Sequence, residues 1–217
     1  MIDRSPRTAT TPYHRAMRAM MLPAFIALTT LALGGCTSAA RVPLSLKTIA
    51  PHTNAQPLEG TRGSLVALVF ISHECPIANA MMPDISSVAT EAKARGVAFF
   101  AVHPASWPTD DALTDHARDY GFQGTVVVLA DRGQELTRLV GATVTPEAAL
   151  LRLDGNGGFE RLYLGRVNDL YAAIGRRRAN PTSNDLLDAI RAASEGRAIA
   201  LPQPKAIGCF IELSPSS

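Results

Sequence analysis

One cysteine stands where a buried strand is expected to run into a helix. Residues 65–71 form a continuous apolar run, typical of a strand buried on both faces, and Cys75-Pro76 follows shortly after it. A thiol at a helix N-terminus lies near free backbone N–H groups and the positive end of the helix dipole, which favour the thiolate. We therefore predict that Cys75 is a redox nucleophile; a small buried side chain without chemistry is the alternative.

A second thiol for Cys75 must come from elsewhere in the chain. The residue three positions on, one helical turn away, is Ala78. Cys209 lies far along the chain in the apolar segment 207–211, after a proline-containing linker, and such a tail can pack across the domain. We expect Cys209 to resolve the mixed disulfide or sulfenic acid formed at Cys75. The alternatives are a buried free thiol and a resolving partner outside the chain.

The third cysteine belongs to an N-terminal leader. A short apolar stretch, residues 20–33, ends in Leu33-Gly34-Gly35-Cys36. The stretch is too short for a transmembrane helix and fits the apolar region of a signal peptide. Its end resembles the lipobox of bacterial lipoproteins, in which the signal is cut before the cysteine and the thiol is diacylated. We predict a signal peptide over 1–35, a lipid anchor at Cys36 and a location in the bacterial envelope facing the periplasm; a soluble periplasmic protein is the alternative.

The charge pattern gives no reason to expect a nucleic-acid partner. The formal net charge is +2 at pH 7, and the leader alone contains Arg4, Arg7, Arg15 and Arg18. The rest of the chain is therefore not basic. With Cys36 lipidated, Cys75 and Cys209 are the two thiols left in an oxidising compartment, where they can pair with each other, exchange with a partner or stay free.

Strands and helices are expected to alternate along the chain. Strands are predicted over 42–49, 65–71, 97–102 and 125–129, followed by a hairpin of 148–153 with 159–164. Helices are predicted over 77–95, from Thr109 to about Gly121, over 134–140, and over 182–193 with Thr182 or Ser183 as cap. This order predicts an α/β fold with a sheet covered on both faces. We divide the chain into a tether (36–44), a domain (45–196) and a tail (197–217).

Several of these segments support a family resemblance. LVFISHECPIANAMMPDI, GVAFFAVHP, DYGF and LADRGQELTRLVGATVTPEAALLRLDGNG resemble the redoxin branch, peroxiredoxin- and TlpA-like, of the thioredoxin-like proteins. The resemblance implies a thioredoxin-like fold with a central mixed sheet, and thiol oxidoreductase activity that needs no cofactor. It also implies a cis Thr145-Pro146 bond beside Cys75. Substrate would bind along Ser72, Pro76, Thr145 and Pro146.

The chain departs from each specialised member of this branch. Thiol–disulfide oxidoreductases carry a second cysteine where Ala78 stands, and peroxiredoxins carry a proline where Leu68 stands and an arginine near Pro146. Copper-delivery proteins of the superfamily carry a cysteine in place of Asn79. The predicted partner is accordingly a protein thiol or disulfide, or a peroxide. A non-catalytic binding module, copper-handling or protein-binding, is the alternative from another class.

Histidines and methionines are candidate ligands for a metal ion beside Cys75. His73, His103, Met81 and Met82 can in principle form a soft metal site with Cys75, but core packing is the simpler explanation for the two methionines, and we predict no resident metal ion. His103 ends a predicted strand on the side where open α/β sheets bind ligands. His116 is expected at the surface of its helix. Trp107 either covers the site or caps the core.

Overall fold

The computed structural model describes residues 44–49, 53–122 and 126–215. The chain divides into two units, residues 1–38 and 39–217. The first unit contains the predicted signal peptide and Cys36, which lie outside the described residues, so the leader and the lipid anchor stay predictions. Among the described residues, no helix has both the length and the apolar character needed to span a membrane.

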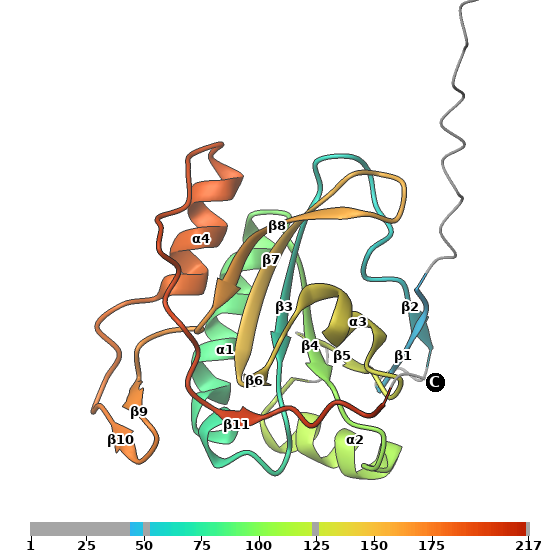
Figure 1. The fold of residues 1–217 in the computed structure, drawn as a ribbon, viewed down its shortest axis with the longest axis vertical. Helices are drawn as coiled ribbons and strands as arrows, with labels where there is room; N and C mark the ends of the chain where they lie inside the picture. Colours follow the sequence, from blue (N-terminus) through green and yellow to red (C-terminus); the bar gives the residue numbers. More distant parts are fainter. Residues whose placement is uncertain (1–43, 50–52, 123–125, 216–217) are drawn as a thin grey trace, which may run out of the picture. The chain divides into compact units, whose positions relative to one another are not determined.

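A seven-stranded mixed sheet forms the centre of the domain, in the order β2-β1-β5-β4-β3-β7-β8 (Figure 1). The central strand β3 runs parallel to β4 and antiparallel to β7, while β4 and β5 are parallel. The strands are β1 (Leu46–Thr48), β2 (Asn54–Ala55), β3 (Leu65–Phe70), β4 (Ala98–His103), β5 (Val127–Ala130), β7 (Glu147–Leu153) and β8 (Phe159–Gly165). The predicted α/β architecture with a mixed central sheet is confirmed.

Helices cover both faces of this sheet, as predicted. Alternate residues of β3 point to opposite faces, so Ala67 and Val69 join one core while Val66, Leu68 and Phe70 join the other. The first core is closed by α1 (Pro76–Ala94), α2 (Asp110–Asp119) and α4 (Asp185–Ser194), and the second by α3 (Glu135–Val140). Burial on both faces explains why β3 reads as an unbroken apolar run.

The caps of α2 and α4 were predicted with different success. Thr109 caps α2, because its hydroxyl accepts a hydrogen bond from the backbone N–H of Ala112 at 3.2 Å. The prediction for α4 is wrong, since the helix begins after Asn184. The backbone N–H groups of Thr182 and Ser183 instead donate to the carboxylate of Asp169, at 2.6 and 3.0 Å. Their hydroxyl groups also donate to carboxylates, Thr182 to Asp169 and Ser183 to Asp185, so neither residue caps the helix.

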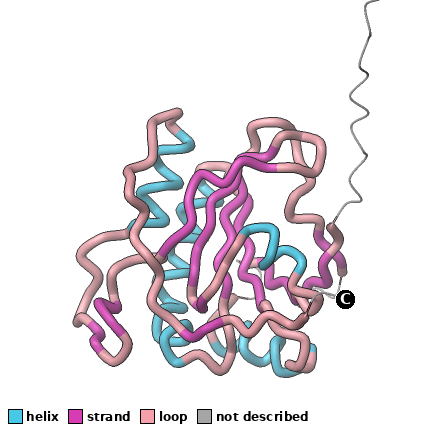
Figure 2. The backbone as a smooth tube through the Cα atoms, viewed as in Figure 1, coloured by secondary structure: helices cyan, strands magenta, loops and turns pink. Residues whose placement is uncertain are grey.

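Two small ladders lie outside the main sheet. One is a hairpin of β9 (Tyr171–Ala173) with β10 (Arg176–Arg177), which the sequence pattern did not predict. The other joins β6 (Val144–Thr145) to β11 (Cys209–Phe210). After α4 the tail runs mainly as loop, drawn pink in Figure 2, until it reaches β6. This short pairing is what brings the C-terminal segment to the end of the sheet where α1 begins.

Candidate functional site

Cys75 caps the N-terminus of α1. Its backbone is extended, with φ −84° and ψ 110°, and Pro76 opens the helix. The sulfur accepts a hydrogen bond from the backbone N–H of Ala78 at 3.4 Å, and the thiol donates to the carbonyl oxygen of Thr145 at 3.0 Å. The residue is only 1% exposed. The predicted placement of this thiol at a helix N-terminus is confirmed, and the structure adds that the thiol is covered.

Thr145 belongs to the segment that faces Cys75 across the site. The Thr145-Pro146 peptide bond is cis, as predicted. Glu147, which the sequence analysis overlooked, fixes this segment from behind: its buried carboxylate accepts hydrogen bonds from the backbone N–H groups of Thr143 and Val144, at 2.6 and 3.4 Å. Because the carboxylate satisfies two N–H groups of the same turn, β6 keeps its free edge toward the tail.

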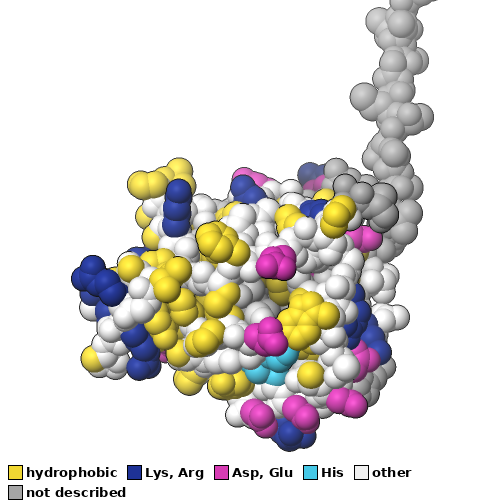
Figure 3. Space-filling model, turned by 60° about the horizontal axis from the view of Figure 1, so that its bottom comes forward, with side chains coloured by type: hydrophobic (Ala, Val, Ile, Leu, Met, Phe, Trp, Pro, Cys, Tyr) yellow, Lys and Arg dark blue, Asp and Glu magenta, His cyan; other side chains and the backbone are white. Residues whose placement is uncertain are grey.

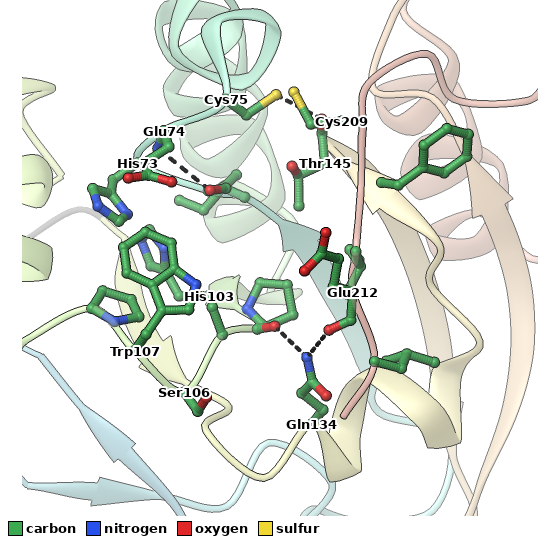
Figure 4. Close-up of a pocket in the computed structure, with 18 of the residues that line it drawn as sticks. His73, Glu74, Cys75, His103, Ser106, Trp107, Gln134, Thr145, Cys209 and Glu212 are labelled. Carbon is green, nitrogen blue, oxygen red and sulfur yellow. Dashed lines mark hydrogen bonds between the residues drawn. The ribbon is translucent and has the colours of Figure 1, made fainter. Parts of the chain in front are cut away.

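The tail places Cys209 on that free edge. In the antiparallel register of β11 with β6, Cys209 faces Thr145 and Phe210 faces Val144. The backbone approach is so close that a Cβ added at Gly208 would stand 2.0 Å from the carbonyl oxygen of Thr145. Both cysteines are in the free thiol form. Figure 4 shows their two sulfur atoms pointing toward one another.

A second side chain that the sequence analysis missed holds the end of the tail. Gln134 is buried, and its Nε2 donates to the carbonyl oxygens of Pro104 and Glu212, at 2.9 and 2.7 Å. Its Oε1 accepts from the backbone N–H of Ser214 at 2.7 Å. Gln134 also has a left-handed backbone, with φ 58°. A non-glycine residue with positive φ is uncommon, but only the fold reveals it, so no sequence signal was available.

The two thiols differ in acidity. Burial by itself raises the pKa of Cys75, yet hydrogen bonds from the Cys209 thiol, from the backbone N–H groups of Ala78 and Cys209, and from the Thr145 side chain bring it below its ordinary value. The pKa of Cys209 is raised to about 11, chiefly by burial and then by its hydrogen bond to Cys75. Cys75 therefore ionises more readily than Cys209.

A pocket of about 540 Å³ opens beside this pair. Among the predicted site residues, Ser72, Cys75, Thr145 and Cys209 line it (Figure 4). Pro76 is exposed in the first turn of α1 and Pro146 is buried, and neither lines the pocket. Trp107 forms part of the wall with 57% of its surface exposed, so the interpretation that it covers the site fits better than core capping.

Three histidines gather at one side of the pocket, where His73 and His103 line it and His116 lies behind them. The rings of His103 and His116 are 5.4 Å apart, and His73 packs on Trp107 with ring centroids 4.9 Å apart. His116 is buried, so its predicted surface position is wrong. Its Nε2 is 2.9 Å from Oδ1 of Asn79, an amide that also donates to the carbonyl oxygen of His73 at 2.9 Å. The packing of α2 against α1 turns this polar residue inward.

Burial sets the charge state of two of these histidines. Burial, with a smaller contribution from the charge of neighbouring histidines, lowers the pKa of His103 to about 3 and that of His116 to about 4. Within 44–49, 53–122 and 126–215, no group of three or more His, Cys, Asp or Glu side chains is arranged to hold a metal ion. Met81 and Met82 lie in the core beneath α1. The soft metal site considered from the sequence therefore finds no support in this arrangement.

Known proteins share this arrangement of elements. A structure of an uncharacterized conserved protein from Geobacillus kaustophilus is 21% identical, with a TM-score of 0.67 over 81% of this chain and 91% of that one. A hypothetical protein from Sinorhizobium meliloti gives 20% identity and the same TM-score over 81% and 93%. The solution structure of a putative thioredoxin from Neisseria meningitidis is 19% identical, with a TM-score of 0.50 over 70% and 87%. These likenesses define a thioredoxin-like fold.

The sequence comparison is more specific about the family. The Redoxin family profile matches residues 23–156, more than half of the chain. The protein therefore belongs to the Redoxin family, and the predicted resemblance to this branch is confirmed. No curated protein matches the chain by sequence.

Proposed function

We propose that the protein is a thiol–disulfide exchange protein that uses Cys75 as nucleophile and Cys209 as resolving thiol. The observation that carries this proposal is the register of β11 on β6, which seats Cys209 opposite Thr145, the residue whose carbonyl oxygen already binds the Cys75 thiol. Cys209 from the tail thereby acts as the resolving thiol, a role that the residue one helical turn after Cys75 cannot fill because it is Ala78. The family supports a redox function of this kind.

The reaction begins at the Cys75 thiolate. It attacks one sulfur of a partner disulfide, the partner's S–S bond breaks, and the first partner thiolate leaves and takes up a proton. Cys209 then loses its proton and attacks Cys75 Sγ, which expels the second partner thiolate. The partner has gained two electrons, and the protein now carries a Cys75–Cys209 disulfide. External thiols then reduce the Cys75–Cys209 disulfide by the reverse steps and regenerate both free thiols.

A partner disulfide fits the site better than a peroxide. Within the part of the chain that the structure describes, the residues lining the pocket include neither arginine nor lysine, so no cationic side chain is present to polarise a peroxide O–O bond. Leu68, at the position of the peroxiredoxin proline, is a fully buried core residue of β3. The pocket is also considerably larger than a peroxide needs.

The test uses the full chain carrying Cys36→Ser, so that two thiols remain. Mild diamide should form one intramolecular disulfide, visible by mass spectrometry of the non-reduced protein. Incubated with an oxidised model disulfide, Cys209→Ser should accumulate a mixed disulfide on Cys75, whereas Cys75→Ser should accumulate none. If both thiols stay free after diamide, or if Cys209→Ser leaves turnover intact, the intramolecular mechanism is wrong. Failure of both variants to react would favour a binding module.

The proposal includes an envelope location with a lipid anchor at Cys36. Its support is the leader sequence that ends in Cys36. Cys36→Ser should move the protein from the membrane fraction to the soluble fraction of the expressing cell. A variant that still sediments with membranes would show that the apolar leader itself is the anchor.

A further inference from the structure

We propose that the pocket selects thiol partners whose cysteine is flanked by positive charge. This inference rests on the proposed exchange function and concerns which partners the thiol pair meets. Its starting point is the charge of the pocket wall. Among the described residues that line it, the carboxylates of Glu74 and Glu212 are the acidic groups, and no lysine or arginine balances them. A space-filling view of this side of the domain shows histidine surface beside acidic and hydrophobic side chains (Figure 3).

The two carboxylates come from opposite sides of the pocket and are free to meet a ligand. Glu74 precedes Cys75, whereas Glu212 lies on the tail, three residues after Cys209. Figure 4 shows the Glu212 side chain across the pocket from His73 and Glu74. Within the described ranges neither carboxylate makes an ion pair or a side-chain hydrogen bond. Both are exposed, so their charge attracts a cation without a large desolvation penalty.

Two arginines lie near the pocket, but within the described residues neither pairs with Glu74 or Glu212. Arg132 pairs with Asp110 at 2.7 Å and donates to the carbonyl oxygens of Ser106 and Pro108. Arg138 donates to the carbonyl oxygen of Gly133 at 2.7 Å, and also to Gln134 Oε1 and the carbonyl oxygen of Ser214, two residues that line the pocket. Both guanidinium groups are thus held by other partners. Asp110, by contrast, is paired with both Arg132 and Lys47.

Two further features of the wall suit a nitrogen cation. Trp107 is 57% exposed, and the face of an indole ring attracts ammonium and guanidinium groups. His103 is 1% exposed, lines the pocket, and has an Nε2 atom with no hydrogen-bond partner in the described structure. In the neutral tautomer that carries its proton on Nδ1, this Nε2 accepts a hydrogen bond from an N–H donor. The wall therefore offers carboxylates, an aromatic face and a buried acceptor, a set that matches lysine or arginine side chains.

This wall influences the step in which the protein is reduced. A partner thiolate attacks one sulfur of the Cys75–Cys209 disulfide, the S–S bond breaks, and one cysteine leaves as a thiolate that takes up a proton. A second partner thiolate attacks the mixed disulfide, which frees the other cysteine and leaves the partner oxidised. Each attack brings a negative charge toward Glu74 and Glu212. Flanking positive charges on the partner offset this repulsion, whereas thiols with flanking carboxylates, such as glutathione, meet it in full.

The test measures reduction of the oxidised full chain carrying Cys36→Ser by three peptides: acetyl-Lys-Cys-Lys-amide, acetyl-Gly-Cys-Gly-amide and acetyl-Glu-Cys-Glu-amide. Rates are divided by each peptide's thiolate fraction, because flanking charge also shifts the peptide's own pKa. At about 0.01 M ionic strength we expect the Lys peptide to react about tenfold faster than the Glu peptide, with the Gly peptide between them. At about 1 M ionic strength the ratio should fall to about two, because the Debye length shrinks to about 3 Å.

Charge-removing variants assign the effect to the pocket. Glu74→Gln and Glu212→Gln should each reduce the Lys-to-Glu rate ratio about twofold at low salt. Glu59→Gln removes the same charge from an exposed residue outside the pocket lining and should leave the ratio unchanged. Equal corrected rates for the three peptides, or equal effects of all three variants, would overturn the inference.

Neutral and cationic small thiols complete the design. 2-Mercaptoethanol has no flanking charge and should reduce the disulfide in every variant, at the parent rate in Glu59→Gln and somewhat faster in Glu74→Gln and Glu212→Gln, which repel its thiolate less. If it fails to do so because no disulfide forms, the proposed exchange function has failed rather than its selectivity. Cysteamine carries one positive charge without a peptide. A preference for cysteamine as large as that for the Lys peptide assigns the site to small cationic thiols, and a preference confined to the peptides assigns it to a protein segment; both outcomes support the inference.

Discussion

The two thiols of the site are held by very different parts of the molecule. Cys75 begins a helix of 19 residues whose inward face is buried against the sheet and α4. Cys209 lies on a strand of two residues, next to Phe210, which is 83% exposed. Opening the β6–β11 ladder breaks few hydrogen bonds, whereas moving Cys75 disturbs the first turn of α1, where Ile77 and Ala78 are buried. Segments with few buried contacts open at low free energy, so the tail should detach locally while the domain stays folded.

This difference suits the chemistry proposed for the pair. A nucleophile gains from a fixed position, since the helix N-terminus and Thr145 then control its acidity and direction. A resolving thiol must leave room for the partner's sulfur and return afterwards. In the structure Cys75 is covered, so the tail has to move before a large partner can reach it. The predictions below test this division into a fixed thiol and a mobile one.

The largest expected effect is a loss of folding stability when the core under α1, the helix that holds Cys75, is weakened. Ile85 lies on α1 and is 0% exposed, so Ile85→Ala should lower the free energy of unfolding by about 3 kcal/mol. Ile211, a half-buried tail residue, is the matched site, and Ile211→Ala should cost less than about 1 kcal/mol. Urea unfolding measures both values. A loss of equal size at the two sites would mean that the tail belongs to the cooperative core.

The second largest expected effect is a loss of folding stability in acid, caused by the buried histidines His103 and His116. Folding lowers the pKa of His103 to about 3 and of His116 to about 4, so the unfolded chain takes up protons first as the pH falls. Each histidine then lowers the free energy of unfolding by up to about 1.4 kcal/mol per pH unit between pH 6.5 and its folded pKa. His116→Gln should reduce the loss between pH 6.5 and 4.5 by about 2 kcal/mol. An unchanged pH slope in urea titrations would contradict the buried, neutral state of His116.

A smaller effect is expected where the tail meets β6. A Cβ at Gly208 would stand 2.0 Å from the carbonyl oxygen of Thr145, so Gly208→Ala must push β11 away. The effective concentration of the Cys209 thiol at Cys75, measured by equilibrating the disulfide with dithiothreitol, should fall about tenfold. Gly133→Ala is the control, because its Cβ would meet only the Glu135 side chain, at 3.7 Å or more. Equal values for both variants would show that β11 does not position Cys209.

The elements that position Cys75 could be predicted because each has a local signal. The apolar run of β3, the helical period of α1 that ends before Gly96 and the turn between β7 and β8 are all written in neighbouring residues. The same holds for Thr145-Pro146, where a family motif points to the cis bond. These features depend on backbone preference and burial of one segment, which a short stretch of sequence reveals.

Contacts between distant segments were not predictable in the same way. The sequence pattern suggested that the tail would reach Cys75, but it did not indicate which tail residue pairs with which strand residue. The observed pairing of Cys209 with Thr145 depends on β6 keeping a free edge. His116 looked exposed among its charged neighbours, and only the packing of α2 on α1 buries it. The second hairpin, β9 with β10, likewise has no strong local pattern. Such features are decided by tertiary packing rather than by local preference.

The smallest expected effect concerns Gln134, which ties the end of the tail to the domain. Its side chain makes hydrogen bonds with Pro104, Glu212 and Ser214. Removing it should free residues after Cys209 while leaving the β6–β11 pairing, so the effective concentration of Cys209 at Cys75 should fall only about threefold. Gln134 also has a positive φ of 58°. Gln134→Gly therefore relieves backbone strain that Gln134→Ala keeps, and the two variants should differ in the free energy of unfolding.

Both variants should nevertheless lower the effective concentration equally, because both lose the same side-chain hydrogen bonds to Glu212 and Ser214 of the tail. The dithiothreitol equilibrium measures this value, and urea unfolding separates it from stability. If Gln134→Gly and Gln134→Ala both retain the parent value, then the two-residue ladder alone holds Cys209 in place. If their effects on the disulfide follow their effects on unfolding, then the tail is not an independent element, and the contrast between a fixed and a mobile thiol fails with it.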